Sequence, residues 1–167
     1  MNISIVIPTY NRKLILRKCL FALENQILNN RIMSYEVIVI DDGSSDGTTN
    51  WIEENKEILP HVVLYEQSHG GPASARNLGV LKSKNEIIIF IDSDLIVVNN
   101  FLISHVDKLY KYWEKFNKNC FTYGSVINTS NFENPESENY KITDISYAYF
   151  ATGNVAISRD LLLKVGL

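Results

Sequence analysis

Asp92 and Asp94 are the residues of this sequence best suited to chemistry. They are two carboxylates separated by one residue, and they directly follow the apolar run IIIFI at residues 87–91. In extended backbone, side chains at this spacing point to the same side, with their Cα atoms about 7 Å apart. Two such carboxylates repel each other unless a positive charge lies between them, and carboxylate oxygens suit Mg²⁺ or Mn²⁺. Because Mg²⁺ usually combines few protein ligands with substrate phosphates, the pair predicts a metal site for a substrate that carries a pyrophosphate.

The alternative interpretation of Asp92-Ser93-Asp94 is structural, since aspartates also cap the turn that follows a strand. For an isolated motif of this kind, the structural interpretation would be the better one. The position of Asp92-Ser93-Asp94 directly after an apolar strand favours the metal site, because ligands of open parallel α/β sheets bind beyond the carboxyl ends of the strands.

Three further polar clusters follow apolar runs. They are residues 8–11 (Pro8, Thr9, Tyr10 and Asn11), residues 41–44 (Asp41, Asp42, Gly43 and Ser44) and residues 69–72 (His69, Gly70, Gly71 and Pro72). Because the carboxyl ends of parallel strands lie at one edge of a sheet, we expect these clusters to meet the Asp92 cluster there.

Asp41 and Arg76 each allow a functional and a structural interpretation. Asp41 ends a predicted buried strand, where its carboxylate could accept a hydrogen bond from a base N–H and so recognise a uracil-like edge. The residues that follow it, 44–47, are also those of an ordinary tight turn. Arg76, one turn into a predicted helix, is either a solvated charge or a donor to a diphosphate.

The glycines and the other aromatic residues are weaker signals. Gly70 and Gly71 let backbone approach a ligand, but neither GxGxxG nor GxxxxGK[ST] is present, which weighs against NAD and ATP. Of the three histidines, only His69 lies at the predicted edge; the others are expected to be structural or solvated. Second-rank candidates for a sugar-binding platform, with core packing as the alternative, are Tyr147, Tyr149 and Phe150.

Apolar runs alternate with helical patterns along the chain, which is typical of βαβ units and a parallel sheet. Strands are predicted at 3–8, 35–41, 62–66, 86–92 and 120–127, with a strand-like segment at 147–157. The first predicted helix begins at an Asn11 cap and has Leu14, Cys19, Leu20 and Leu23 on one face. Further helices are predicted at 48–57, from Pro72 onwards, at 101–116, and from a Ser158 cap to Gly166. A surface loop is predicted at 128–143. Since the strands are almost continuously apolar, helices should cover both faces of the sheet.

Composition narrows the class of protein. The 167 residues suit one domain, and 46% apolar with 21% charged residues is typical of a globular protein with a real core. The net charge is −3 and no basic stripe occurs, so nucleic acid is not an expected partner. Cys19 and Cys120 form no CxxC pair, which favours a reduced, cytoplasmic setting. No signal peptide or apolar run of membrane-spanning length is present, which leaves only a peripheral membrane contact open.

Five segments, in this order, resemble family 2 glycosyltransferases of the Rossmann-like GT-A fold over essentially the whole chain: VIPTYNR, EVIVIDDGSSDGT, GGPASARNLG, FIDSD and TGNVAISRDLLLKVG. The resemblance implies transfer of a sugar from a nucleotide-diphosphate donor, usually UDP-linked, with inversion at the anomeric carbon and Mn²⁺ or Mg²⁺ on the diphosphate. It also implies a glycan or lipid-linked acceptor in polysaccharide biosynthesis, at the inner face of the membrane, and is compatible with a homo-oligomer.

The same resemblance implies roles for individual residues. Thr9 and Tyr10 would line the nucleotide pocket, Asp41 would contact the base, and Arg76 would lie near the donor. In the DxD motif, Asp94 would bind the metal and Asp92 would lie near the ribose. The predicted nucleotide-sugar-binding residues are Pro8, Thr9, Tyr10, Asn11, Asp41, Gly71, Arg76, Asp92 and Ser93, and the predicted metal ligands are Asp92 and Asp94.

One departure from the family pattern concerns the catalytic base. In similar proteins the segment resembling LLKVGL continues into an acidic stretch that supplies this base, whereas this sequence stops at Leu167. Inversion by direct displacement needs a carboxylate that takes the proton of the acceptor hydroxyl. We therefore expect a single truncated domain, with a nucleotide-binding half at 1–97, the start of an acceptor-side half at 98–167, and a base beyond it.

Two alternatives from other classes remain. The first is a nucleotide-sugar-binding module without turnover, which a sugar-transfer assay would distinguish. The second is a nucleotidyltransferase or phosphatase that uses an aspartate pair. That class would need a basic, glycine-rich phosphate loop or a nucleophilic DxD after the first strand, and PTYNR at residues 8–12 provides neither.

Overall fold

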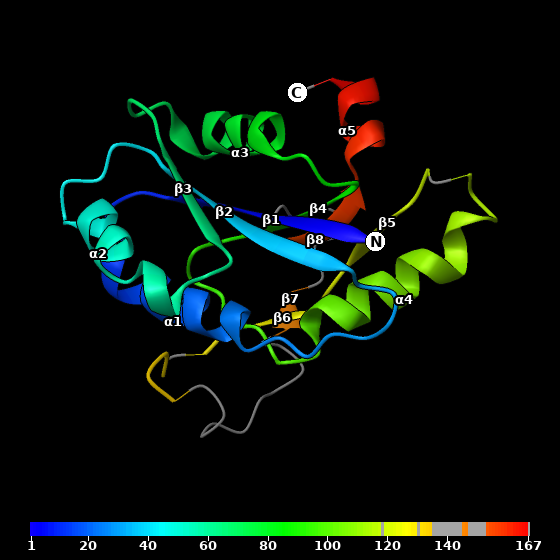
Figure 1. The fold of residues 1–167 in the computed structure, drawn as a ribbon, viewed down its shortest axis with the longest axis horizontal. Coiled ribbons are helices and arrows are strands. Elements are labelled where there is room, and N and C mark those ends of the chain that lie inside the picture. The colour runs from blue at the N-terminus through cyan, green and yellow to red at the C-terminus, as the bar shows by residue number, and fades with distance from the viewer. Residues whose placement is uncertain (118, 130, 135–144, 147–152, 167) are drawn as a thin grey trace.

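A six-stranded sheet with strand order β3-β2-β1-β4-β8-β5 forms the centre of the fold (Figure 1). The computed structural model describes residues 1–117, 119–129, 131–134, 145–146 and 153–166. The strands of this sheet are β1 (Asn2–Thr9), β2 (Ser34–Asp41), β3 (Val62–Glu66), β4 (Ile87–Ile91), β5 (Phe121–Tyr123) and β8 (Asn154–Ser158). A second pairing joins β6 (Val126–Ile127) to β7 (Ile145–Ser146).

The sheet is parallel over its first four strands, as the alternation of apolar runs and helical patterns predicted. β1 pairs in parallel with β2 on one side and with β4 on the other, and β2 pairs in parallel with β3. In this sheet β8 runs antiparallel to both of its neighbours, β4 and β5. The strand order reverses direction between β1 and β4, and ligands of open α/β sheets bind at such a switch point.

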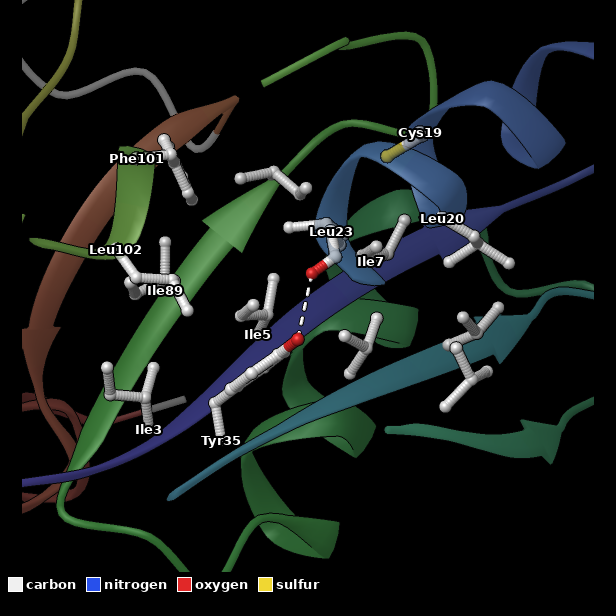
Figure 2. Close-up of a cluster of buried hydrophobic side chains, with 14 of the residues drawn as sticks. Ile3, Ile5, Ile7, Cys19, Leu20, Leu23, Tyr35, Ile89, Phe101 and Leu102 are labelled. Atoms are coloured by element: carbon white, nitrogen blue, oxygen red, sulfur yellow. Dashed lines mark hydrogen bonds between the residues drawn. The ribbon is translucent and has the colours of Figure 1, made fainter. Parts of the chain in front are cut away.

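Helices cover both faces of the sheet, because side chains of each strand alternate between two cores (Figure 1). Ile5 of β1 packs towards α1 (Lys13–Glu24) and α4 (Phe101–Trp113), which lie on the same face as α2 (Thr48–Glu54). Val6 packs towards α3 (Gly71–Lys82) and α5 (Arg159–Val165) on the opposite face. Figure 2 shows the first core, in which the Tyr35 hydroxyl donates to the carbonyl of Leu23 at 3.0 Å. No helix of the described residues is long and apolar enough to cross a membrane.

The start of α1 differs from the prediction in two respects. Leu14 is 71% exposed, whereas Leu16 is buried with Cys19, because helical spacing from Cys19 reaches Leu16 and not Leu14. Asn11 does not cap the helix: it has φ 51 and its side-chain oxygen accepts from the Ser45 amide at 2.8 Å. The side chain of Asn11 is therefore used to hold the loop after β2.

The second half of the chain also differs from the predicted strands. The segment predicted as one strand at 120–127 divides at Gly124, and β5 and β6 belong to different sheets. A Cβ at Gly124 would lie 2.3 Å from Asn154 Nδ2, so the chain leaves the main sheet where Asn154 packs against it. The predicted helix at 48–57 is α2 followed by a 3-10 turn at Lys56–Ile58.

The last helix begins and ends as predicted. The Ser158 hydroxyl accepts from the Leu161 amide at 3.2 Å, and Gly166 ends α5 with φ 95. Three predictions lie partly or wholly outside the described residues: most of the loop at 128–143, the first part of the strand at 147–157, and the aromatic residues Tyr147, Tyr149 and Phe150.

Replacing Gly79 with alanine should destabilise the fold, because α3 lies close to β1 at this residue. A Cβ at Gly79 would lie 2.3 Å from Cγ1 of Val6. Overpacking of this kind costs about 1–3 kcal/mol of the free energy of unfolding, although the better helix propensity of alanine offsets about 1 kcal/mol. The measurement is the urea midpoint, with Leu81→Ala, at a residue 61% exposed on the same helix, as the control. Equal midpoints for Gly79→Ala and the native chain would contradict the expectation.

Candidate functional site

A cleft of about 420 Å³ opens at the carboxyl ends of the parallel strands. Its lining residues are Pro8, Thr9, Tyr10 and Arg12 at and after β1, Asp42 after β2, His69 and Pro72 after β3, Arg76 in α3, and Asp92, Ser93 and Asp94 after β4. The four polar clusters therefore meet at one edge of the sheet, as the sequence predicted.

Three of the predicted site residues, Asn11, Asp41 and Gly71, are not part of this lining. Asp41 is only 1% exposed, and its carboxylate accepts from the Ser44 amide at 2.9 Å and from the Thr49 hydroxyl at 2.7 Å. The structure thus uses Asp41 to hold the turn after β2 and places its neighbour at the cleft instead.

Asp42 anchors the loop that connects β3 to α3. One carboxylate oxygen accepts from the Gly70 amide at 2.8 Å and from Gln67 Nε2 at 2.6 Å. The other accepts from the Gly71 amide at 2.8 Å and lies 2.9 Å from His69 Nδ1. Burial raises the pKa of Asp42, but these hydrogen bonds and the nearby histidine lower the pKa below its usual value overall. Asp42 is therefore ionised at neutral pH and fixes one wall of the cleft.

Tyr10 and His69 form an aromatic wall beside Asp42. Their ring centroids are 4.2 Å apart with an angle of 30° between the ring planes. The Tyr10 residue is 44% exposed, and the His69 side chain is 57% exposed. Exposed aromatic faces in a cleft are surfaces on which nucleobases stack. Both residues were predicted at this edge, but their contact depends on the loop that Asp42 holds and has no local pattern in the sequence.

The aspartates of the DxD motif are each paired with an arginine. Asp92 Oδ1 accepts from Arg76 Nη2, and Asp94 Oδ2 accepts from Arg12 Nη1, both at 2.5 Å. The backbone after β4 is a turn, closed by the Leu95 amide and the Asp92 carbonyl at 3.3 Å, and not the extended segment assumed from the spacing. The positive charge expected beside the carboxylates is thus supplied here by two guanidinium groups.

Arg12 was not among the predicted site residues, because its aspartate partner lies 82 positions further along the chain. Arg76 is not a solvated surface charge, since its side chain is only 16% exposed. Within the described residues, the buried atoms Thr9 Oγ1 and Arg76 Nε have no hydrogen-bond partner. Buried polar groups are normally satisfied, so two such atoms at one cleft indicate a site for a polar ligand.

The aspartates also meet the requirements of a hard divalent cation. Their side chains are 43% and 44% exposed, and each gives only one oxygen to its arginine. A Cβ at Gly153 would lie 2.8 Å from Asp92 Oδ2, so the residue before β8 lies directly beside this carboxylate. The described residues contain no group of three or more histidine, cysteine, aspartate or glutamate side chains that could hold a metal. A cation held by these two carboxylates would complete its coordination with water, or with the phosphates of a ligand.

The fold and the cleft define an α/β domain with a polar cleft at the switch point of a mostly parallel sheet. The chain belongs to glycosyl transferase family 2, whose family model matches residues 4–166. A poly(ribitol-phosphate) beta-glucosyltransferase of Bacillus spizizenii is 38% identical over 96 residues, which cover 56% of this chain and 15% of that protein.

Solved structures of two other proteins share the fold. S. aureus TarS 1–349 superposes with a TM-score of 0.68 at 21% identity, over 99% of this chain and 49% of that one. The same protein in complex with UDP-GlcNAc matches at 25% identity with a TM-score of 0.57, over 70% of this chain and 32% of that one. The mannosyltransferase PcManGT from Pyrobaculum calidifontis, in complex with GDP-Man and Mn²⁺, matches with a TM-score of 0.63 at 23% identity, over 98% of this chain and 46% of that one.

These comparisons confirm the predicted family and the GT-A fold. The chain spans less than half of the length of each of these relatives.

Proposed function

We propose that the cleft binds a nucleotide-diphosphate sugar of the UDP class, with a divalent cation, for inverting transfer of the sugar to an acceptor hydroxyl. The observation that carries the proposal is that one cleft combines two kinds of lining. It holds an exposed aromatic wall, which suits a base, and two aspartates with two arginines, which suit a diphosphate and its cation. The UDP-GlcNAc complex of TarS, which shares the fold, supports this assignment.

The base would stack on Tyr10 and displace the ring of His69. The two rings lie 4.2 Å apart, whereas rings that enclose a base must be separated by about 7 Å, twice an ordinary carbon–carbon contact. The His69 side chain is mostly exposed, so its contact with Asp42 can be given up at little cost, while the backbone of its loop stays held by the Asp42 carboxylate. Base binding would therefore change one side chain and keep the loop in place.

The diphosphate would lie beside Arg76 and the aspartates. Asp94 and Asp92 would hold Mg²⁺ or Mn²⁺, which when bound neutralises the diphosphate and so favours departure of the nucleoside diphosphate. The guanidinium of Arg76 is oriented by Asp92, and its buried Nε has no partner among the described residues. A charged, directed donor of this kind suits a phosphate oxygen.

The remaining parts of the reaction follow from the family and not from the cleft. The identity of the general base and the division into halves at residue 97 stay predictions. We further propose a glycan or lipid-linked hydroxyl as the acceptor, which the name of the poly(ribitol-phosphate) relative supports. The peripheral membrane contact and the homo-oligomer also stay predictions.

Binding of nucleotides measured by calorimetry in the presence of Mn²⁺ tests the proposed function. We expect UDP to bind more tightly than ADP or CDP, and Tyr10→Ala to weaken UDP binding by about tenfold, because stacking of one base contributes about 1–3 kcal/mol. Tyr112→Ala, at an exposed tyrosine of α4 that does not line the cleft, is the matched control and should leave UDP affinity unchanged. Equal affinities of the native chain for the three nucleotides would refute base recognition at this cleft.

A further inference from the structure

The two ion pairs of the cleft differ in how easily they can be exchanged. The side chains of Arg12 and Asp94 are 49% and 44% exposed, so water competes with their attraction. The Arg76 side chain is only 16% exposed, and separating it from Asp92 would leave a buried charge unpaired. Arg12 is therefore the cleft cation that can leave its aspartate at little cost.

From its position in the cleft, the Arg12 side chain could also contact the phosphates of a ligand. Its backbone is fixed, because the Arg12 carbonyl accepts from the Ile15 and Leu16 amides at 3.1 and 2.9 Å at the start of α1. The side chain lines the cleft and reaches across it to the turn after β4. A guanidinium released from Asp94 would remain at the cleft, where a planar fork of donors matches phosphate oxygens.

We propose that Arg12 is an exchangeable counter-ion: it holds Asp94 in the cation-free cleft and moves to the donor diphosphate when a divalent cation takes Asp94. The inference rests on the proposed function. Asp94 Oδ2 accepts from Arg12 in the structure, and the two cations would compete for this carboxylate. After the exchange, each charged group of the cleft would have an opposite charge beside it. The divalent ion would lie at the aspartates, Arg76 would stay paired with Asp92, and Arg12 would face the added negative charge of the diphosphate.

Calorimetric titrations of the whole chain with Mn²⁺ alone, and with UDP at saturating Mn²⁺, test the exchange. Arg12→Gln should bind Mn²⁺ more tightly, by up to about fivefold, since it removes the weak competitor for Asp94. The same variant should bind UDP about tenfold more weakly in the presence of Mn²⁺, because a charged donor to the diphosphate is lost. Opposite changes in the two affinities are the signature of one residue that serves both partners.

Arg12→Lys and Arg31→Gln are the controls. Arg12→Lys keeps the charge and should bind Mn²⁺ like the native chain, while it recovers only part of the UDP affinity because a lysine lacks the planar fork. Arg31 forms a similar exposed ion pair, at 2.8 Å from Asp107, and does not line the cleft. Arg31→Gln should therefore change neither the Mn²⁺ affinity nor the UDP affinity.

Three outcomes decide the proposal. Tighter Mn²⁺ binding by Arg12→Gln with unchanged UDP affinity would overturn it, because Arg12 would then only compete with the cation. Normal Mn²⁺ binding by the native chain with identical titrations for Arg12→Gln would also overturn it and leave the proposed function intact. No Mn²⁺ binding by the native chain would contradict the metal site of the proposed function and would overturn the exchange with it.

Discussion

Replacing Asp94 with alanine should abolish the dependence of UDP affinity on Mn²⁺. In the native chain, chelation of the cation by EDTA should weaken UDP binding by about a hundredfold or more, since even residues that only orient metal ligands contribute tenfold to a hundredfold. Asp94→Ala should bind UDP equally with and without EDTA, because a direct ligand of the cation is lost. The ion pair of Asp94 with Arg12 is exposed, so the melting temperature should change little.

Asp107→Ala is the matched control for this experiment. Asp107 forms an ion pair of similar exposure with Arg31, and it does not line the cleft. Its removal should leave the effect of EDTA unchanged. Equal UDP binding by the native chain with and without EDTA would contradict the assignment of the metal to this motif.

Replacing Asp42 with alanine should destabilise the chain and open the cleft. The substitution leaves the partly buried hydrogen bonds from the amides of Gly70 and Gly71 and from the side chain of Gln67 without their acceptor. Each such hydrogen bond contributes about 0.5–1.5 kcal/mol net, so a loss on the order of 2 kcal/mol is expected, or about 6 °C in melting temperature at neutral pH. UDP binding should weaken at the same time, because the loop that carries His69 loses its anchor.

The destabilisation by Asp42→Ala should depend on pH with a defined sign. The pKa of Asp42 is lower in the folded chain than its ordinary value near 4, so the carboxylate contributes its stabilisation above about pH 4 and loses it as the pH falls through the lower folded pKa. Asp46, whose pKa is raised by burial but lowered overall by hydrogen bonds from Thr48 and the Lys13 amide, contributes in the same direction. The native chain should therefore lose stability in acid.

Thermal unfolding of both chains from pH 7 to pH 3 measures this dependence. The difference in melting temperature between the native chain and Asp42→Ala should be largest at neutral pH and should shrink below about pH 4. Asp107→Ala, which removes an exposed carboxylate, should lower the melting temperature by little at any pH. A difference that stays constant across this range would show that the Asp42 charge does not anchor the loop.

The sequence by itself determined the architecture and the edge at which ligands bind. Almost continuous apolar runs such as residues 87–91 indicate strands buried on both faces, and their alternation with helical patterns leaves a parallel sheet as the simple solution. The polar clusters that follow these runs then had to meet, because parallel strands share one carboxyl edge. The Ser158 cap was likewise predictable, since it depends only on residues within one turn.

Only the tertiary structure decided which neighbouring side chains serve the cleft. Asp41 and Asp42 are the same residue type, and their roles depend on a loop from another part of the chain whose Gly70 and Gly71 amides donate to the carboxylate of Asp42 and not to that of Asp41. The partnership of Arg12 with Asp94 depends in the same way on how α1 packs beside the end of β4. Local patterns determine elements because the forces involved act within a few residues, whereas these pairings are set by packing between segments that the sequence keeps far apart.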